Sequence, residues 1–490
     1  MARLADVYRP SLALLTDLYE ITMAYGYWRE GRHDREAVFH LSFRRNPFGG
    51  GFAVACGLHR ALDLVEELRF EAEDIGYLAT LEGADGRPLF HPDFLAHLGR
   101  MRLECDLDAV PEGTLVFPHE PLLRVLGPLS QCQLLETALL NLVSFETLIA
   151  TKAARMCLAA HGEPVLEFGL RRAQGVDGAL SASRAAYVGG CAATSNVLAG
   201  RLFGIPVRGT HAHSWVMSFD SERDAFGAYA RALPNNVVLL VDTFDSLEGV
   251  RRAIEVGRSL REAGHELLGV RLDSGDLAYL SLEARRLLDQ AGFEATSIMA
   301  SNDLDERVIA SLKEQGAAIG VWGVGTQLAT GGDQPALGAV YKLGAVRGPD
   351  GRWQHKVKLS EQAAKVSNPG VQQVRRYGDA HEFREDLVYD VELGLPAQPM
   401  LVDPLDATRR RRVAPDLAWE DLLVPVVRGG RVLYARPDIE AVRGRVQAQL
   451  GRFHAGIKRF VNPHRYPVGL EAGLHDLKTR LVLAARGLNG

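Results

Sequence analysis

The sequence predicts an α/β protein whose middle part forms an irregular parallel α/β barrel. Three observations predict this class. Apolar runs recur between residues 163 and 346, with starts roughly twenty to thirty residues apart, the length of one βα unit. Stretches with helix start and stop signals separate most of these runs. Polar and charged residues follow the ends of the runs, where the loops of a parallel barrel form a binding site.

Length and composition limit the possible classes of protein. The chain has 490 residues, too many for one hydrophobic core, so two or three domains are expected. A hydrophobic fraction of 47% and a charged fraction of 24% are typical of a soluble globular protein. The net charge is −5 and there is no basic block, so we expect no nucleic-acid partner. A local cationic pocket could still bind a small anion.

The sequence also predicts where the protein is located. No apolar run is long enough to cross a membrane, and the charged first ten residues lack the apolar core of a signal peptide. The five cysteines are scattered without a C-x-x-C pair, which argues against a disulfide framework and against structural zinc. We therefore expect a cytoplasmic protein without a membrane partner.

Residues 1 to about 130 have a mixed α and β pattern. Residues 14–23 are predicted to form a helix, and residues 37–43 alternate as a strand does. A basic turn at Arg44 and Arg45 then leads into the glycines at 49–51. These glycines lack the Lys-Ser/Thr of a P-loop, so the turn could bind phosphate or could be a flexible solvated loop.

Eight apolar runs are read as barrel strands: 164–168, 190–192, 206–208, 237–241, 268–272, 297–300, 319–322 and 338–341. Continuous apolar strands that alternate with helices predict a buried parallel sheet. Asp245 and Asp303, each followed by Glu three residues later, have the spacing of helix capping boxes. Gly264, Gly292 and Gly316 stand where the following helices should end.

Six of the eight predicted strands are followed by polar residues: Arg171 and Arg172; 210–214; 242–245; 273–276, with Arg271 at the strand end; 301–303; and 323–326. The carboxyl ends of parallel strands meet on one rim, so we expect these side chains to converge. Asp245 and Asp303 could equally be plain helix caps. No cap requires His213, Arg271 or Asp273, so these three are the stronger candidates.

The predicted rim can perform three kinds of chemistry. The Gly-Val-Gly-Thr turn at 323–326 offers backbone N–H groups and a hydroxyl for a phosphate monoester. Asp242 and Asp273 can hold Mg²⁺ that screens a pyrophosphate. Arg171 and Arg271 can bind a carboxylate or phosphate. By itself, the cluster at 209–214 could bind phosphate, accept a phosphoryl group or cap a helix.

These segments together resemble nicotinate phosphoribosyltransferases. The matching residues occur in order between about 12 and 370, and the last 110 or so residues contribute little. The segments are Leu-Thr-Asp-Leu-Tyr at 15–19, Phe-Arg-Arg-Asn-Pro-Phe at 43–48, Glu-Phe-Gly-Leu-Arg-Arg-Ala-Gln-Gly at 167–175, Gly-Thr-His-Ala-His-Ser at 209–214, Val-Asp-Thr-Phe-Asp at 241–245, Val-Arg-Leu-Asp-Ser-Gly-Asp at 270–276, Ser-Asn-Asp at 301–303 and Gly-Val-Gly-Thr at 323–326.

The resemblance implies a reaction and an architecture. Nicotinate and 5-phosphoribosyl 1-pyrophosphate would give nicotinate mononucleotide and pyrophosphate, with ATP hydrolysis coupled, in the salvage route of NAD biosynthesis. The irregular parallel barrel would pack against an α/β sandwich built from N- and C-terminal segments, in a homodimer with shared active sites. The expected domains are 1–135 for the N-terminal sandwich part, 136–346 for the barrel and 347–490 for the C-terminal segment.

The resemblance also implies roles for substrate-binding residues. Tyr19 of the neighbouring subunit and Phe168 would stack on the pyridine ring. Thr210 and Arg271 would hold the nicotinate carboxylate, and Thr326 the ribose 5-phosphate. The substrate-binding residues expected are Tyr19, Phe168, Arg171, Thr210, Arg271, Gly325 and Thr326.

The implied catalytic residues are His213, Asp242 and Asp273. ATP would phosphorylate His213, and a neutral histidine is able to attack a phosphoryl group. His211 is expected to face solvent or to support its neighbours. Mg²⁺ is the expected cofactor and ATP the co-substrate, while the metal ligands are left unassigned.

Three alternatives remain. A nicotinamide phosphoribosyltransferase would have an Asp near residues 194–196, and this chain has Thr-Ser-Asn there, which favours the acid substrate. An aldolase-like or flavin-dependent barrel enzyme is a second alternative, although no predicted strand clearly carries a Schiff-base Lys. A non-catalytic barrel that binds phosphorylated metabolites is the third.

Overall fold

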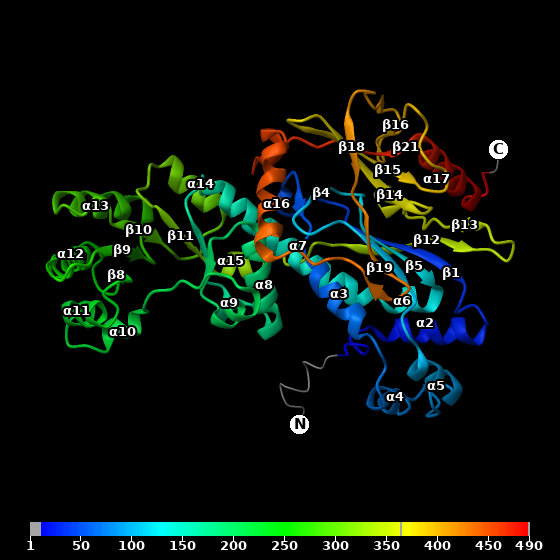
Figure 1. The fold of residues 1–490 in the computed structure, drawn as a ribbon, viewed down its shortest axis with the longest axis horizontal. Helices are drawn as coiled ribbons and strands as arrows, with labels where there is room; N and C mark the ends of the chain where they lie inside the picture. The colour runs from blue at the N-terminus through cyan, green and yellow to red at the C-terminus, as the bar shows by residue number, and fades with distance from the viewer. Residues whose placement is uncertain (1–10, 363–364, 489–490) are drawn as a thin grey trace. The chain divides into compact units, whose positions relative to one another are not determined.

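A computed structural model of the chain describes residues 11–362 and 365–488. Contacts divide the chain into two units. Unit 1 comprises Met1–Thr147 and Ala336–Gly490, and unit 2 comprises Leu148–Pro335. In Figure 1, blue, cyan, yellow and red segments therefore occur together in unit 1, while unit 2 is mainly green. These units mark where contacts concentrate, and the three domains expected from the sequence stay predictions.

Unit 2 is built on one parallel sheet of six strands, in the order β7-β6-β11-β10-β9-β8. The strands are β6 (Val165–Glu167), β7 (Ala193–Thr194), β8 (Val237–Leu240), β9 (Leu267–Leu272), β10 (Ser297–Ala300) and β11 (Val321–Val324). All five pairings are parallel. The apolar residues of these strands are almost entirely buried, as expected for a sheet covered by helices. The predicted parallel α/β fold is confirmed as a half-barrel.

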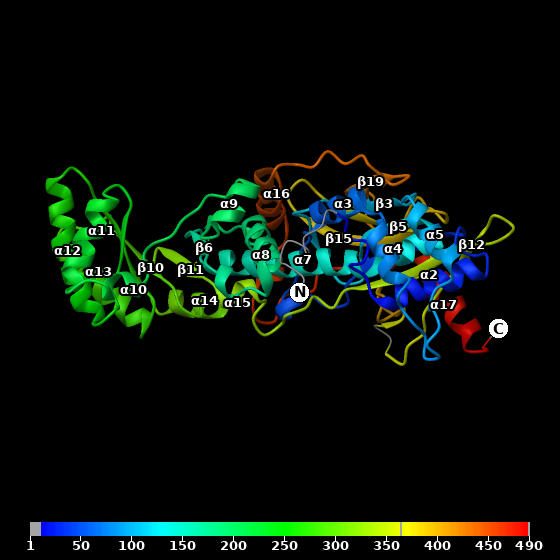
Figure 2. The same cartoon turned by 90° about the horizontal axis from the view of Figure 1, so that it is seen from below.

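Helices connect the strands of unit 2 (Figures 1 and 2). They are η2 (Leu170–Arg172), α8 (Gly175–Gly189), α9 (Val197–Phe203), α10 (His213–Met217), α11 (Glu222–Ala232), α12 (Ser246–Glu262), α13 (Leu277–Gln290), α14 (Glu306–Glu314) and α15 (Thr326–Ala329). Asp245 caps α12 by accepting from the Glu248 N–H. Glycines 264, 292 and 316 follow α12, α13 and α14 with positive φ, as predicted.

The cap predicted at Asp303 is wrong by two residues. Asp305 is the N-cap of α14 and accepts hydrogen bonds from the N–H groups of Arg307 and Val308. Glu306, which the spacing suggested as the answering capping-box residue, is instead buried against Lys152 and Arg155 of α7 (Glu136–Ala159). The Glu306 carboxylate therefore pairs with Lys152 and Arg155 and does not cap the helix. Burial disfavours its ionised form, but the two cations outweigh that effect and hold the pKa of Glu306 below its usual value.

Two of the eight predicted strands are not part of the parallel sheet. The third run is reduced to a single bridge between Val207 and Thr194. The eighth run belongs to β12 (Val340–Arg347), which pairs antiparallel with β1 (Glu36–Ser42) in unit 1. A short apolar run fits a parallel or an antiparallel partner equally well, so its pairing depends on residues far away in the sequence.

Unit 1 contains two larger sheets and a two-stranded one. Their orders are β13-β12-β1-β5-β3-β19-β20, β17-β16-β21-β15-β14-β18, and β2-β4. The strands not yet bounded are β2 (Ala53–Val54), β3 (Asp106–Ala109), β4 (Leu115–Val116), β5 (Pro121–Pro128), β13 (Trp353–His355), β14 (Gln372–Gly378), β15 (Phe383–Asp390), β16 (Met400–Val402), β17 (Arg410–Arg412), β18 (Ala418–Asp421), β19 (Val424–Arg428), β20 (Arg431–Val432) and β21 (Val468–Glu471). The pairing of β3 with β19 confirms that N- and C-terminal segments share one α/β body.

Helices of unit 1 come from both ends of the chain. They are α2 (Leu18–Arg29), η1 (Pro47–Gly49), α3 (Leu58–Glu67), α4 (Ala72–Leu78), α5 (Pro92–Arg100), α6 (Leu129–Leu134), α16 (Ile439–Arg452), η4 (Ala455–Lys458) and α17 (Ala472–Ala485). A buried ion pair links the early and late segments, since Arg376 of β14 bonds both Asp386 of β15 and the Leu115 carbonyl of β4.

One helical stretch, at residues 129–159, is long and apolar enough to cross a membrane by length and composition alone. It corresponds to α6 and α7, and 61% of its most apolar window is buried. Leu139, Ile149 and Ala153 are fully buried, as in the core helix of a globular protein. Such a stretch is weak support for a membrane span, and the cytoplasmic location stays a prediction.

Candidate active site

The carboxyl ends of β8, β9 and β10 bring four predicted site residues together in unit 2. Arg271 lies at the end of β9, in register with Leu240 of β8 and Met299 of β10. Asp242 and Asp273 follow β8 and β9, and His213 begins α10. The predicted convergence on one rim is therefore present in the structure.

Arg271 is the centre of the rim. Its Nη1 donates to Thr210 Oγ1 at 2.8 Å and its Nη2 to Asp273 Oδ1 at 3.0 Å. Its Nε donates to Ser301 Oγ at 2.8 Å. The guanidinium carbon also lies 5.8 Å from the centre of the Phe168 ring. One half-buried cation thus links the ends of β9 and β10 with the loop that carries Thr210 and fixes the orientation of these side chains.

His213 lies between the loops that follow β8 and β9. Its Nδ1 is 3.2 Å from Thr243 Oγ1, and its Nε2 is 3.7 Å from Asp273 Oδ2. The side chain is 39% exposed, so a ligand can reach it. An imidazole held by a hydroxyl on one nitrogen and facing a carboxylate with the other has a defined orientation for nucleophilic chemistry.

His211, two residues earlier, differs from His213 in every respect. It is buried, and its Nε2 accepts a hydrogen bond from the Leu240 N–H at 3.2 Å. Burial, together with the charges of Arg271 and His213, lowers its pKa. The expectation that His211 faces solvent is wrong, and the alternative that it supports its neighbours fits this geometry.

Asp242 and Asp273 are coupled through the backbone. Asp242 Oδ2 accepts from the Asp273 N–H at 2.8 Å and from Ser274 Oγ at 2.6 Å. Asp242 Oδ1 is buried without a hydrogen-bond partner among the described residues. Burial disfavours the ionised form of Asp273, but hydrogen bonds from Ser301 and Arg271 outweigh that effect and its pKa lies below the usual value. Asp273 is therefore anionic at neutral pH.

The loop after β6 approaches the Gly-Val-Gly-Thr turn closely. The Phe168 N–H donates to the Val324 carbonyl at 2.7 Å. A Cβ at Gly323 would lie 2.9 Å from the Phe168 ring, and one at Gly169 would lie 3.1 Å from the Gly325 carbonyl oxygen. Glycine at 323 and 169 is thus what lets the aromatic ring and the predicted phosphate turn lie against each other.

Glu167 is a site-supporting residue that the sequence reasoning did not single out. Its buried carboxylate accepts hydrogen bonds from the Gly169 N–H, from Ser183 Oγ at 2.9 Å and from Thr194 Oγ1 at 2.5 Å. It therefore holds the loop that carries Phe168. The available signal was a glutamate at the end of an otherwise apolar strand, where a charge is tolerated only with partners.

Two of the predicted substrate-binding residues make fewer contacts. Arg171, in η2, is exposed and has no hydrogen bond or ion pair to another described residue. Thr326 is half-buried as the first residue of α15, and Gly325 immediately precedes it. Arg171 follows Phe168 closely in the sequence, and the turn with Gly325 and Thr326 contacts the Phe168 loop. Because none of the three residues is buried, a ligand can reach them.

Tyr19 lies in unit 1, on α2. It lines a cavity of about 300 Å³ together with Glu136 of α7 and Lys342 of β12. Burial, followed by a hydrogen bond with Glu20, raises the pKa of the Tyr19 hydroxyl, which therefore stays protonated. The residue as a whole is 46% exposed, so a partner or ligand can reach it.

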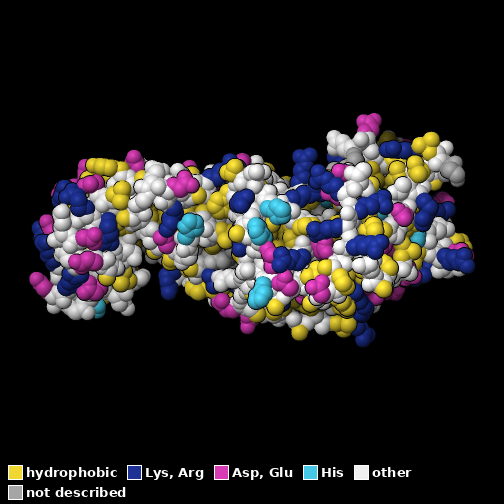
Figure 3. Space-filling view, turned by 90° about the horizontal axis from the view of Figure 1, so that it is seen from above, with side chains coloured by type: hydrophobic (Ala, Val, Ile, Leu, Met, Phe, Trp, Pro, Cys, Tyr) yellow, Lys and Arg dark blue, Asp and Glu magenta, His cyan; other side chains and the backbone are white. Residues whose placement is uncertain are grey.

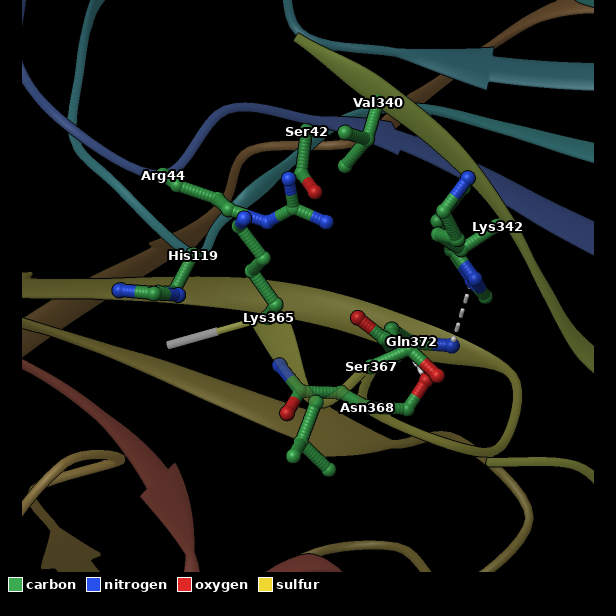
Figure 4. A pocket seen from close by; sticks show the side chains of 11 residues that line it. Ser42, Arg44, His119, Val340, Lys342, Lys365, Ser367, Asn368 and Gln372 are labelled. Carbon is green, nitrogen blue, oxygen red and sulfur yellow. Dashed lines mark hydrogen bonds between the residues drawn. The ribbon is translucent and has the colours of Figure 1, made fainter. Parts of the chain in front are cut away.

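A second pocket of unit 1 is strongly cationic (Figure 4). Arg44, Lys342 and Lys365 come from three different segments and line it together. No Asp or Glu is among its lining residues, and the others are His40, Ser42, His119, Val340, Val366, Ser367, Asn368 and Gln372. Burial lowers the pKa of His40 to about 3 and that of His119 to about 4, so both rings are neutral. The pocket is built for an anion.

The surface of unit 2 carries both signs of charge. In Figure 3, basic and acidic side chains alternate around α12 and α13. Several of them form exposed ion pairs, such as Arg251 with Glu248 and Arg286 with Glu283. A face of this kind gives no continuous positive field for a polyanion.

A parallel half-barrel whose strand ends carry a cation, two carboxylates and a glycine-rich turn defines an enzyme for phosphorylated small molecules. Residues 14–144 match the nicotinate phosphoribosyltransferase (NAPRTase) N-terminal domain, and residues 372–478 match the nicotinate phosphoribosyltransferase C-terminal domain. The chain is 42% identical to nicotinate phosphoribosyltransferase of Bacillus subtilis (strain 168), over 96% of this chain and 97% of that protein. Identity to the Bos taurus nicotinate phosphoribosyltransferase is 38%, over 97% of each.

Solved structures agree. The crystal structure of human nicotinic acid phosphoribosyltransferase is 35% identical with a TM-score of 0.83, over 95% of this chain and 99% of that one. The nicotinate-nucleotide pyrophosphorylase from Pyrococcus furiosus shares the fold, with a TM-score of 0.70 at 21% identity over 92% and 97% of the two chains. The chain belongs to the nicotinate phosphoribosyltransferase family, and the resemblance found in its motifs is confirmed.

Proposed function

We propose that this enzyme forms nicotinate mononucleotide and pyrophosphate from nicotinate and 5-phosphoribosyl 1-pyrophosphate. ATP hydrolysis is coupled to the reaction through a phosphohistidine at His213, and the product enters NAD biosynthesis by salvage. The observation that carries the proposal is the arrangement of Arg271, Thr210 and Phe168, a cation and a hydroxyl beside an aromatic face. That combination suits a flat ring with a carboxylate.

Nicotinate binds at this arrangement in our proposal. One edge of the Arg271 guanidinium and the Thr210 hydroxyl bind the carboxylate, and Phe168 lies against the pyridine ring. Charge-assisted hydrogen bonds from arginine to a carboxylate are among the stronger polar contacts in proteins. Residues 194–196 are Thr-Ser-Asn and include no acid that could repel the substrate, and the Glu167 carboxylate that Thr194 contacts already accepts three hydrogen bonds.

The transfer step needs positioning more than base catalysis. The pyridine nitrogen carries no proton at neutral pH and attacks C1′ as the C1′–O bond to pyrophosphate breaks. The N–H groups of the 323–326 turn and the Thr326 hydroxyl bind the 5-phosphate, which fixes the ribose. Asp242 stays bound to the Asp273 N–H and to Ser274, so the floor of the site is rigid during the step.

Asp242 and Asp273 are the residues suited to Mg²⁺. The fit rests on Asp242 Oδ1, a buried carboxylate oxygen without a hydrogen-bond partner among the described residues. Carboxylate oxygens are the ligands that Mg²⁺ prefers. When bound there, Mg²⁺ would supply neutralising charge for the pyrophosphate that leaves.

His213 accepts the γ-phosphoryl group of ATP in this proposal. In the tautomer that this step requires, Nδ1–H would donate to Thr243 Oγ1, 3.2 Å away, and the Nε2 lone pair would attack phosphorus. The N–P bond forms as the bond between phosphorus and the bridging oxygen breaks, and ADP leaves. Water later cleaves the N–P bond and releases phosphate. Asp273, anionic beside Nε2, stabilises the positive charge that develops on the imidazole.

A homodimer with shared active sites accounts for the two features of unit 1. The exposed ring of Tyr19 would stack on the pyridine bound by the neighbouring subunit. The cationic pocket of Arg44, Lys342 and Lys365 would hold phosphates of ATP or phosphoribosyl pyrophosphate. A pocket lined by one guanidinium and two ammonium groups, with no carboxylate among its lining residues, favours such polyanions electrostatically.

The deciding experiment measures pyrophosphate release with nicotinate, nicotinamide or quinolinate, each with and without ATP. Release with nicotinate, enhanced by ATP, and ³²P transfer from γ-labelled ATP to His213 are the expected results. Activity with nicotinamide but not with nicotinate would overturn the acid-substrate assignment. Binding of phosphoribosyl pyrophosphate without any release would favour the non-catalytic alternative.

A further inference from the structure

The strand β8 lies at an open edge of the parallel sheet. The sheet order ends at β8, whose only strand neighbour in the described part of the chain is β9. The Val241 N–H donates across that pairing to the Arg271 carbonyl at 3.1 Å. The preceding amide, that of Leu240, is turned the other way and donates to the imidazole of His211. A side chain thus takes the place that a further strand would occupy.

The segment from Val207 to His211 ties the two edges of the half-barrel together. Upstream, Val207 forms a parallel bridge with Thr194 of β7, the strand at the opposite end of the sheet order. Arg208 N–H donates to the Thr194 carbonyl at 3.0 Å. Four residues beyond Val207, His211 Nε2 accepts from Leu240 on β8 at 3.2 Å. The loop therefore spans from one edge of the sheet to the other, and the imidazole makes the second attachment.

The His211 ring is held in one orientation. Its centre lies 4.8 Å from that of Tyr229, edge to face, and 6.1 Å from that of Phe226, both on α11. Because Nε2 accepts, the ring proton is on Nδ1, which lies 3.3 Å from the Ala212 carbonyl oxygen. Burial keeps the ring neutral, the state in which Nε2 can accept.

The residues on either side of His211 belong to the rim. Thr210 Oγ1 accepts from Arg271 Nη1 at 2.8 Å, and its neighbour in the chain is the imidazole anchor. His213 contacts Thr243 Oγ1, only three residues beyond Leu240. Any shift of the loop relative to β8 therefore moves the Thr210 hydroxyl and the His213 ring together, away from Arg271 and Asp273.

We propose that His211 is a positioning residue: its neutral imidazole closes the sheet edge at Leu240 and so sets the place of Thr210 and His213 on the rim. The part that concerns His213 rests on its proposed phosphorylation, whereas the part that concerns Thr210 rests only on the rim geometry. Effective catalysis needs reacting groups placed to within a fraction of an ångström, so an anchor of this kind affects turnover.

The test compares two variants. His211→Phe keeps the ring packing on Tyr229 but cannot accept the hydrogen bond from the Leu240 N–H, whereas the side-chain carbonyl oxygen of His211→Gln can accept it. His211→Leu is a second acceptor-free variant, in case the Phe variant does not fold. Three readouts are measured on the full-length enzyme: kcat and KM for nicotinate, amide hydrogen exchange at Leu240, and label on His213 from γ-labelled ATP. Tyr229→Leu, which removes ring packing but keeps the acceptor, is the control.

We expect kcat to fall roughly 10- to 100-fold in the acceptor-free variants, the size of effect that a small misplacement produces. Leu240 exchange should accelerate at least about tenfold, as for an amide that has lost its hydrogen bond. His211→Gln should keep most of the parent's kcat and most of the protection of the Leu240 amide. The control Tyr229→Leu should lose more stability than turnover. A folded Phe or Leu variant with kcat within twofold of the parent, or with unchanged Leu240 exchange, would overturn the proposal. If the parent enzyme takes up no label, the proposed phosphorylation of His213 is wrong. The kcat values and the Leu240 exchange rates then still test the role of His211.

Discussion

The Arg271 guanidinium donates to the Thr210 hydroxyl over 2.8 Å, although the two residues are 61 positions apart in the chain. This bond joins the end of β9 to the loop that also carries His211 and His213. It places a fixed positive charge and a hydroxyl beside Phe168. The proposed nicotinate site is therefore organised around one arginine, and its contacts lead to the first prediction.

Arg271→Lys should raise the KM for nicotinate by about 10- to 100-fold, because a point charge cannot replace the two-sided guanidinium contacts worth about 1.5–3 kcal/mol. Steady-state kinetics with varied nicotinate measures the effect. Arg286→Lys, on the exposed face of α13, is the matched control and should leave KM unchanged. Equal KM values in the two variants would contradict a carboxylate contact at Arg271.

His213→Asn should abolish transfer of label from ATP and uncouple ATP hydrolysis, since an amide cannot form a phosphoramidate of this kind. Phosphoribosyl transfer without ATP should persist at a reduced level, because Arg271 and Thr210 remain. His265→Asn, at the opposite end of β9, serves as control and should label normally. Undiminished ATP coupling in the His213→Asn variant would contradict the proposal that His213 accepts the phosphoryl group.

Gly323→Ala should reduce kcat/KM by displacing the Phe168 ring. The added Cβ would lie 2.9 Å from a ring atom and 3.2 Å from Ser301 Cβ, so the ring must move. Overpacking of this kind costs about 1–3 kcal/mol. Gly320→Ala, with no atom within 4 Å of its Cβ, is the control. Kinetics and thermal unfolding of both variants measure the difference, and indistinguishable behaviour would argue against close packing at Gly323.

Asp386→Asn should destabilise unit 1 strongly, because it removes the carboxylate that is hydrogen-bonded to the fully buried Arg376. Breaking one side of a buried pair costs about 3–5 kcal/mol. Unfolding in urea measures the loss. Asp379→Asn, in an exposed pair with Arg384, should change stability little. A small effect at Asp386 would mean that water or another group replaces the lost charge.

The stability that Asp273 contributes should depend on pH in the acid range alone. Its pKa in the folded protein lies below the value of 3.8 for an unperturbed Asp, so the unfolded state binds a proton first as the pH falls. The contribution is present above about pH 4 and is lost as the pH falls through the folded pKa. The difference in unfolding free energy between the parent and Asp273→Asn should be constant from pH 5 to 8 and shrink below about pH 4. A difference that shrinks near neutral pH would contradict the lowered pKa.

Much of the candidate site could be predicted from sequence because it lies at the ends of regular elements. Arg271 lies at the end of a buried apolar run, Asp242 and Asp273 directly follow such runs, and a parallel sheet brings these ends together. Thr210 and His213 follow a run too weak to form a strand, yet the bridge at Val207 still delivers them to the rim. Local periodicity was sufficient for these residues.

Other features depended on distant partners. The role of Glu167 was not visible, since a glutamate after an apolar run gives no indication of the Ser183 and Thr194 hydroxyls that bind it. The cationic pocket combines Arg44 with Lys342 and Lys365, about three hundred residues later. The family resemblance separated His213 from His211, but neither the burial of His211 nor its hydrogen bond with the Leu240 N–H was visible in the sequence.

By itself, the sequence determined the alternation of strands and helices, the set of reactive side chains on the rim and the family, because each is written in local order and spacing. The tertiary structure decided which strands pair, that six and not eight form the parallel sheet, and that His211 anchors the loop while His213 faces the site. The physical reason is the same in each case. Hydrogen-bond partners and burial are relations between residues far apart in the chain, and they arise only when the backbone is folded.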